Sequence, residues 1–214
     1  MARQVQPRIL VNDRADVPGD SVTAEQYQPA AALGGGTVPW EVAQTLNASW
    51  GYARNDTAWK PVDMLIAMLV DTVSKGGNLL LNVGPDARGR FPPEAVERLR
   101  GIAAWMRLHA RAIHGCGPSA FTPPPDCRYT QRGDRLYLHL LRWPYGHVHL
   151  PGLAGRVAHA QLLDDGSQVR TRVVPPGHEG HMADMGGLPA GTLTLDLPTA
   201  RPGVAVPVIE LFLT

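Results

Sequence analysis

The sequence predicts an α/β layer fold over residues 1–117, followed by a small all-β domain over residues 118–214. Three observations lead to this prediction. In the first part, short apolar strands alternate with segments of helical period. The proline- and glycine-rich stretch "GCGPSAFTPPPDC" (115–127) then interrupts that pattern. Beyond it, strand-period segments follow one another without a helix, which is typical of a β-sandwich.

The first part is expected to begin with strands. Residues 7–13, "PRILVND", contain a continuous apolar run of the kind found in a parallel sheet covered on both faces. A long loop follows, with "PGD" and "LGGG" as its turn signals. "WEVAQTLN" (40–47) predicts a second short strand.

Two helices and a third strand complete the first part. Residues 62–73 carry apolar side chains at helical spacing, with Pro61 at the start and Gly76-Gly77 at the end. A strand over 79–83 follows at once. A second helix is expected to begin after Pro92-Pro93. Its predicted buried stripe consists of Val96, Leu99, Ile102, Ala103 and Met106.

The second part reads as strands throughout. The strand-period segments are residues 134–143, 147–152, 157–174, 191–198 and 206–213. Within the third of these, Asp165-Gly166 predicts a hairpin turn.

Composition excludes some classes of function. The formal net charge is +1 and no basic run stands out, so nothing supports binding to nucleic acid. The longest apolar run is far too short to span a membrane. The start, "MARQVQPRILVNDR", lacks the apolar core of a signal peptide. Cys116 and Cys127 can either pair or stay free, and their spacing to the histidines does not suit a metal site. We expect no metal and no cofactor.

Polar residues follow two of the predicted strands, Asn12-Asp13-Arg14 after the first and Asn82 after the third. In parallel α/β barrels, active residues lie at the carboxyl ends of strands. Carboxylates and aromatic residues lie between these two strand ends: Asp20, Glu25, Glu41, Trp50, Tyr52 and Trp59. Aromatic rings and charged groups together suit a sugar, which has apolar faces and a hydroxyl rim. The same residues also have structural interpretations, as packing tryptophans, an ion pair between Asp13 and Arg14, and a capping Asn82.

Five segments taken together are more specific. They are "VNDR" (11–14), "GDSVTAEQYQP" (19–29), "WEVAQTLNASWGY" (40–52), "LVDTVSKGGNLLLNVGPDARG" (69–89) and "WMRLHARAIHG" (105–115). In order and spacing they resemble the C-terminal half of an α-L-fucosidase of glycoside hydrolase family 29. The resemblance is strong over residues 7–117, and the strand-rich remainder matches the family's C-terminal β-sandwich in kind.

The resemblance implies a fold and an activity. The fold would be the C-terminal part of a (β/α)8-like barrel in residues 1–117, with a β-sandwich in 118–214. The activity would be removal of terminal α-L-fucose from glycans with retention of configuration. Retention needs two carboxyl groups roughly 5–5.5 Å apart, a nucleophile and a general acid/base. The family's nucleophile aspartate lies upstream of the "VNDR" strand, in a motif that this chain lacks, so the chain is expected to be inactive alone.

Site residues carry over position by position. Arg14 matches a family position that contacts the sugar, and Trp50 matches an aromatic residue that packs on the fucose methyl group. Glu25 falls where the family's general acid/base sits on a mobile loop. Glu41 is the alternative, although hydrogen bonds beside Trp40 would explain it as well. The family often has Glu where this chain has Arg111 and Tyr where it has His114, so no role is carried over to those two positions.

Other hypotheses stay open. A non-catalytic glycan-binding fragment would need Arg14 and Trp50 but not Glu25, and the absent nucleophile favours it. A phosphate site at "SKGGN" is disfavoured because its glycines lack the spacing of a phosphate-binding loop. The resemblance implies a fucosylated glycan as partner, leaves a homo-oligomer open, and specifies neither linkage nor aglycone. Family members are commonly exported or lysosomal, and any signal peptide would lie upstream of Met1.

Overall fold

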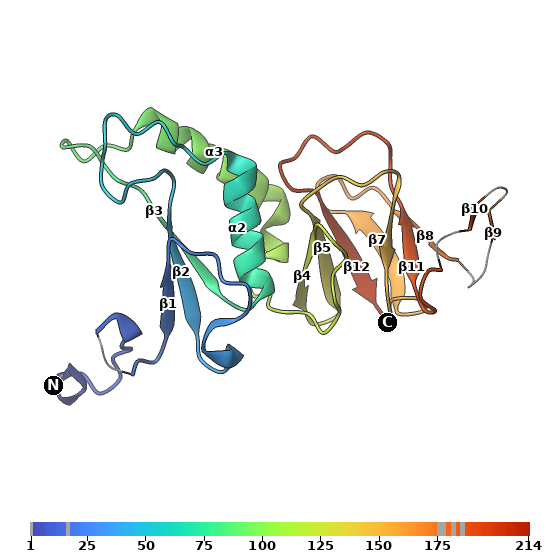
Figure 1. The fold of residues 1–214 in the computed structure, drawn as a ribbon, viewed down its shortest axis with the longest axis horizontal. Helices are drawn as coiled ribbons and strands as arrows, with labels where there is room; N and C mark the ends of the chain where they lie inside the picture. Colours follow the sequence, from blue (N-terminus) through green and yellow to red (C-terminus); the bar gives the residue numbers. More distant parts are fainter. Residues whose placement is uncertain (1, 16–17, 175–178, 181–182, 185–186) are drawn as a thin grey trace. The chain divides into compact units, whose positions relative to one another are not determined.

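The computed structural model describes residues 2–15, 18–174, 179–180, 183–184 and 187–214. The chain divides into two compact units, Met1–Ile102 and Ala103–Thr214. Helix α3 (Pro93–His109) runs across this division (Figure 1). The domain boundary predicted between residues 117 and 118 stays a prediction.

A three-stranded parallel sheet lies at the centre of the first unit. Its order is β1 (Val22–Glu25), β2 (Trp40–Thr45) and β3 (Asn78–Asn82). Helix α2 (Val62–Ser74) connects β2 to β3, as a parallel pair requires. The strands β2 and β3 and both helices confirm the predicted elements. Three short helical segments complete the unit: α1 (Ala2–Val5), η1 (Asp13–Ala15) and η2 (Leu33–Gly36).

The strand predicted over residues 7–13 is wrong. Only Asn12 pairs with the sheet, through a single parallel bridge to Ser21. The Leu10 side chain is 81% exposed, so this apolar run is not covered on two faces. The backbone groups of Val11 are instead bonded to Asp20, whose N–H donates to the Val11 carbonyl (2.6 Å) and whose carboxylate accepts from the Val11 N–H (2.8 Å).

The strand β1 lies inside the segment that was predicted to be a long loop. Apolar and polar residues alternate along β1: Val22 and Ala24 are apolar, and Thr23 and Glu25 are polar. This period of two is the signal that a half-covered strand leaves in a sequence. The strand is only four residues long, and because turn residues flank it, the sequence pattern predicts a loop here.

The predicted stripe of α3 is partly wrong. Ala103 is exposed, and the helix instead buries Ala95, Trp105 and His109. Trp105 is held by a hydrogen bond from its indole Nε1 to the Val206 carbonyl (2.8 Å). Val96, Leu99, Ile102 and Met106 are half-buried.

Two antiparallel sheets share one core in the second unit. The larger has the order β4 (Cys127–Arg132), β5 (Arg135–Leu140), β12 (Val208–Leu213) and β7 (Val157–Leu162). The smaller has the order β6 (His147–Leu150), β11 (Leu193–Asp196) and β8 (Arg170–Val173). Both contribute to one hydrophobic cluster, which includes Leu136, Leu150, Leu195 and Ile209.

Smaller features complete the second unit. The segment η3 (Ala110–Ala112) follows α3, and β9 (Glu179–Gly180) pairs with β10 (Ala183–Asp184). The turn predicted at Asp165-Gly166 is confirmed, because Gly166 has a φ of 73° and its N–H donates to the Leu162 carbonyl (3.0 Å). The strand β4 was not predicted. Cys116 and Cys127 are both free thiols.

Arg111, to which the resemblance assigned no role, has a structural partner. Its Nη2 lies 3.1 Å from Oε2 of Glu210, whose side chain is only 4% exposed. Gln161 Nε2 donates to the same carboxylate (2.8 Å), and Arg135 Nε lies 3.8 Å from the other oxygen. A buried carboxylate with three such partners holds the neighbouring strands together.

Replacing Glu210 by alanine is therefore expected to lower the free energy of unfolding by about 1–3 kcal/mol, because Arg111, Arg135 and Gln161 lose the charged acceptor that joins them. Urea denaturation would measure the change. Glu97→Ala is the matched control, since that side chain is 75% exposed and also pairs with an arginine. It should change stability by less than about 0.5 kcal/mol. Equal effects of the two variants would contradict a structural role for the Glu210 cluster.

The described residues contain no helix that combines the length and the hydrophobicity needed to cross a membrane.

Candidate active site at the carboxyl edge of the parallel sheet

The carboxyl ends of β1, β2 and β3 lie along one edge of the sheet because the three strands are parallel. Glu25, Thr45 and Asn82 are their last residues. Alternation and register place these three side chains on the same face of the sheet, since Glu25 is opposite Ala43 and Thr45 is opposite Asn82. The loops that follow the strands supply the rest of the site.

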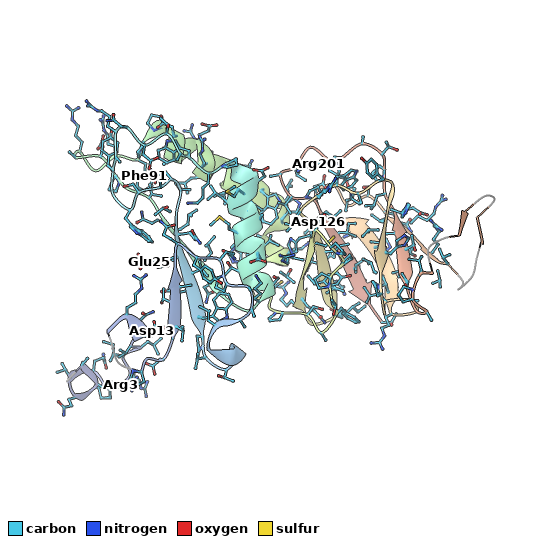
Figure 2. All side chains as sticks on the ribbon, in the orientation of Figure 1. Arg3, Asp13, Glu25, Phe91, Asp126 and Arg201 are labelled. Carbon is cyan, nitrogen blue, oxygen red and sulfur yellow. The ribbon has the colours of Figure 1, made fainter. Side chains whose placement is uncertain are left out.

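Arg14 and Glu25 are in direct contact at this edge. Arg14 Nη2 forms an ion pair with Glu25 Oε2, and the side chains are 49% and 46% exposed. Two bonds hold the Arg14 segment in place: Arg14 N–H donates to Asn12 Oδ1 (2.9 Å), and Thr23 N–H donates to Asp13 Oδ1 (3.1 Å). Figure 2 shows Asp13 and Glu25 on neighbouring parts of the chain.

Glu25 is the last residue of β1 and does not lie on a loop, which corrects its predicted local setting. A strand end fixes the backbone of a side chain while leaving its carboxylate open to solvent. The carboxylate therefore stays accessible to a ligand on a more rigid support than the sequence suggested.

Glu41 lies elsewhere on the sheet. It is the second residue of β2, opposite Thr23 of β1 and Asn78 of β3. Two residues along a strand correspond to roughly 7 Å, so Glu41 is about that far below the level of Glu25. Thr23 Oγ1 donates to Glu41 Oε1 (3.3 Å). A hydrogen bond of this kind agrees with the structural interpretation of Glu41.

Trp50 lies in the loop after β2. Its side chain is 40% exposed, and its carbonyl accepts a hydrogen bond from Asn82 Nδ2 (2.7 Å). Asn82 therefore connects the end of β3 to the loop that carries Trp50. Within the described part of the chain, no hydrogen bond or ion pair joins Trp50 to Arg14 or Glu25.

Gly84 allows this loop to approach β3 closely. A Cβ atom at Gly84 would lie only 2.5 Å from the Gly51 carbonyl carbon and 2.7 Å from Tyr52 N. A side chain at position 84 would therefore force the two loops apart, whereas a Cβ at Gly51 would meet nothing within 4 Å.

Gly84→Ala should consequently lower the free energy of unfolding by about 1–3 kcal/mol through steric overlap with backbone. Gly51→Ala adds the same methyl group to the facing loop in open space and serves as control. Differential scanning calorimetry of both variants would check the expectation. A Gly84→Ala protein as stable as Gly51→Ala would mean that the loops are not held together at this point.

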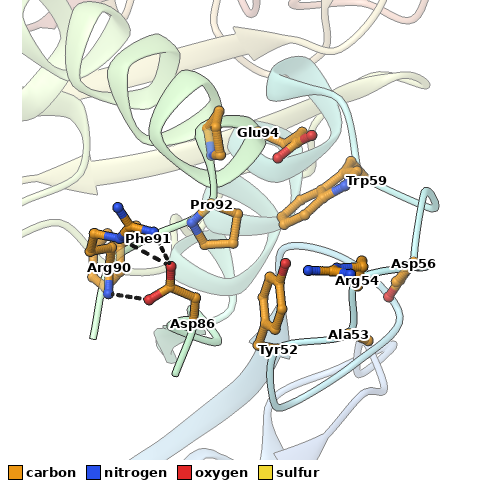
Figure 3. A pocket seen from close by; sticks show the side chains of 11 residues that line it. Tyr52, Ala53, Arg54, Asp56, Trp59, Asp86, Arg90, Phe91, Pro92 and Glu94 are labelled. Atoms are coloured by element: carbon orange, nitrogen blue, oxygen red, sulfur yellow. Dashed lines mark hydrogen bonds and ion pairs between the residues drawn. The ribbon is translucent and has the colours of Figure 1, made fainter. Parts of the chain in front are cut away.

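A groove of about 470 Å³ lies beyond the ends of β2 and β3 (Figure 3). Tyr52, Trp59 and Phe91 provide its aromatic side chains, and its charged residues are Arg54, Asp56, Asp86, Arg90 and Glu94. The backbone N–H of Arg90, followed by the Arg90 side chain and the Arg88 N–H, lowers the pKa of Asp86 despite some desolvation. The Asp86 carboxylate thereby fixes the loop after β3, with Arg90 Nη2 at 3.0 Å.

Lys60 fixes the loop after β2. Its Nζ donates to the carbonyls of Thr45 (2.6 Å) and Asn47 (3.1 Å), and burial lowers its pKa. Charged side chains thus order both loops of the groove: Lys60 ties the first loop to the end of β2, and Asp86 holds the second loop together from within.

Sequence reasoning named Trp50, Tyr52 and Trp59 but missed Asp86, Arg90, Phe91 and Glu94. Their position in the sequence could have indicated them, because they follow the strand end "NLLLNVGP". The arrangement offers a carboxylate, a guanidinium, aromatic faces and an open groove. These groups can bind hydroxyls and apolar sugar faces and can exchange a proton.

The profile of the family described as Alpha-L-fucosidase matches residues 1–111. A plasma alpha-L-fucosidase from Rattus norvegicus is 30% identical over 208 residues, which cover 91% of this chain and 42% of that protein. Alpha-L-fucosidase isoenzyme 1 from Paenibacillus thiaminolyticus aligns with a TM-score of 0.85 and 35% identity, over 100% of this chain and 52% of that one. The Thermotoga maritima alpha-fucosidase in complex with fucose aligns with a TM-score of 0.73 and 28% identity, over 98% and 46%. The chain thus spans about half the length of these proteins.

Proposed function

Because the chain belongs to the alpha-L-fucosidase family, we propose that it forms part of the active site of a retaining exo-α-L-fucosidase acting on fucosylated glycans. One observation carries the proposal. Arg14 and Glu25, 11 positions apart in the sequence, meet at the carboxyl edge of the parallel sheet. This is where barrel enzymes place their chemistry.

Glu25 is proposed as the general acid/base. In the first step its carboxyl group protonates the glycosidic oxygen while a nucleophilic carboxylate attacks the anomeric carbon. In the second step the Glu25 carboxylate removes a proton from the attacking water, and the sugar is released with its configuration retained. The half-exposed position of Glu25 supports this role, since both the leaving group and water must reach it.

Arg14 and Trp50 are proposed to hold the fucose. The Arg14 guanidinium donates hydrogen bonds to sugar hydroxyls, which would take the place of its contact with Glu25. The exposed Trp50 ring packs against the methyl group of fucose. The groove of Tyr52 and Trp59 follows the same strand ends and is proposed to receive the remainder of the glycan.

The nucleophile is proposed to come from an aspartate outside these 214 residues. The unit Met1–Ile102 has three parallel strands among its described residues, whereas a closed (β/α)8 barrel has eight. Residues 1–117 would then be the C-terminal part of such a barrel and residues 118–214 a β-sandwich. The chain covers only 52% and 42% of two related proteins, which supports a nucleophile outside these residues.

Glu41 is the less favoured acid/base. Its place near the amino end of β2 and its hydrogen bond from Thr23 support a structural role. A general acid must exchange its proton at the edge where the substrate is bound.

The test compares the chain alone with a chimera that joins it to the N-terminal half of the Paenibacillus thiaminolyticus enzyme. Circular dichroism establishes folding, and release of nitrophenol from a nitrophenyl α-L-fucoside measures turnover. We expect turnover by the chimera and none by the chain alone. Fucose binding by a folded chimera without turnover would favour the glycan-binding alternative. Turnover by the chain alone would mean that a carboxylate such as Asp13 or Glu41 serves as nucleophile.

A further inference from the structure

A second hollow with sugar-binding chemistry lies in the second unit. It measures about 280 Å³ and is bordered by the segments before β4 and between β5 and β6. Trp143 and Tyr145 provide its aromatic groups, and Asp126 and Arg142 its charges. Figure 2 labels Asp126 at the start of β4.

Tyr145 is unusually exposed for an aromatic residue. Its relative exposure is 92%, higher than that of any other large hydrophobic side chain among the described residues. Covering a solvent-exposed aromatic side chain with a ligand removes apolar surface from water, which lowers the free energy. Tyr145 is therefore suited to contact a ligand and contributes little to the core.

Hydrogen bonds tie the turn that carries Tyr145 to the segment at Leu197 and Pro198. Gly146 has a φ of 68°, and its carbonyl accepts a hydrogen bond from Leu197 N–H (2.7 Å). Trp143 Nε1 donates to the Pro198 carbonyl (3.2 Å), and Pro144 fixes the backbone between the two aromatic residues. The Trp143 ring and the backbone that carries Tyr145 are thus held in advance, which reduces the entropy lost on binding.

Asp126 and Arg142 add polar groups that are free to bind a ligand. Both side chains are exposed, and within the described residues neither has an ion pair or a side-chain hydrogen bond. Asp126 has a φ of 58°, a left-handed conformation that aspartate adopts more readily than most residues. Its carboxylate accepts hydrogen bonds and the Arg142 guanidinium donates them, as neighbouring hydroxyls of a sugar ring require.

We propose that Trp143, Tyr145, Asp126 and Arg142 form an auxiliary binding site for one pyranose residue of a neutral oligosaccharide. The aromatic residues contact the C–H face of the ring, and the two charged side chains bond its hydroxyls. The site does not depend on Glu25, Arg14 or Trp50. It would hold the glycan chain without cleaving it.

The test uses the complete 214-residue chain and three sugars without fucose: lactose, methyl α-glucoside and methyl α-mannoside. Two-dimensional ¹H–¹⁵N NMR follows the Trp143 indole N–H and the backbone of residues 126 and 142–146. We expect at least one sugar to cause saturable shifts there, with a dissociation constant on the order of 1 mM. Because the probes lack fucose, the result is independent of the proposed hydrolytic activity.

Four variants distinguish sugar binding at this site from non-specific shifts. Tyr145→Ala should weaken binding at least about tenfold, whereas Tyr145→Trp should retain it because a ring remains. Asp126→Asn, which tolerates the same backbone conformation, should weaken binding through loss of a charged acceptor. Tyr27→Ala is the matched control, since Tyr27 is a 61% exposed tyrosine in the first unit. It should leave binding unchanged. Absence of saturable shifts with all three sugars, or shifts confined to residues 52–59 and 86–94, would overturn the proposal.

Discussion

Replacing Glu25 by alanine in the active chimera is expected to lower kcat by about 10²–10⁴-fold, the usual contribution of a general acid/base. The loss should be largest for natural glycans, whose sugar leaving group needs protonation. A nitrophenyl leaving group needs little protonation, so its departure should be nearly normal, and the second step should then limit turnover. Stopped-flow measurement should consequently show a burst of nitrophenol followed by a slow phase.

Azide distinguishes this role from simple loss of structure. It attacks the covalent sugar–enzyme intermediate without needing a general base, so it should restore the turnover of Glu25→Ala and yield a fucosyl azide. Glu41→Ala is the control and should change kcat far less, because its contact with Thr23 is structural. A large, azide-rescued loss in Glu41→Ala together with a normal Glu25→Ala would reverse the two assignments.

Acidification is expected to destabilise the second unit through two buried histidines, His109 and His139. Both are fully buried, and burial lowers the pKa of each, that of His139 to about 3. Their hydrogen bonds fit neutral rings: His109 Nδ1 donates to the Trp105 carbonyl (2.9 Å). Thr130 donates to the Ala112 carbonyl (2.7 Å), so His139 Nε2 must donate to Thr130 (2.8 Å).

The direction of this pH effect follows from the number of protons that each state binds. Below about pH 6.5 the unfolded chain protonates these histidines while the folded chain does not, so the unfolded state binds more protons. The free energy of unfolding should therefore fall on acidification, by about 1.4 kcal/mol per pH unit for each histidine. For His139 this loss continues down to about pH 3. At neutral pH neither histidine contributes to the dependence.

Urea denaturation between pH 7 and pH 4 would measure this slope. His139→Gln should reduce the slope by roughly one proton, because glutamine can donate to Thr130 but does not titrate. His114→Gln makes the same substitution at an exposed histidine and serves as the matched control. Identical slopes for the parent and the His139→Gln protein would show that His139 is not held neutral.

Several elements were decided by the sequence itself. Pro61 and Gly76-Gly77 bound a helix whose apolar residues recur at helical spacing, and α2 forms there. Asp165-Gly166 specifies a turn because glycine accepts the positive φ that the turn needs. Such elements depend on contacts between near neighbours, which a local pattern records. The five motifs likewise indicate the family, because their order and spacing can be read from the sequence alone.

Elements that need distant partners were decided by the tertiary structure. The apolar run at Ile9-Leu10 looks like a buried strand, yet a strand requires neighbours on its edges and faces, and only Asn12 finds one. Glu25 became a strand residue because β1 pairs with β2. Trp105 is buried, and its indole N–H donates to the carbonyl of Val206, about a hundred positions further along the chain.

The candidate site shows the same division. The sequence by itself determined its chemistry: a carboxylate, an arginine and aromatic residues near strand ends, in the order of the fucosidase family. Only the tertiary structure decided that Glu25 meets Arg14 while Glu41 lies lower on the sheet. It also formed the groove, since the loops of Tyr52 and Asp86 come together where Gly84 has no side chain to separate them. The physical reason is strand register, which the pairing of distant segments sets and which no local pattern of residues encodes.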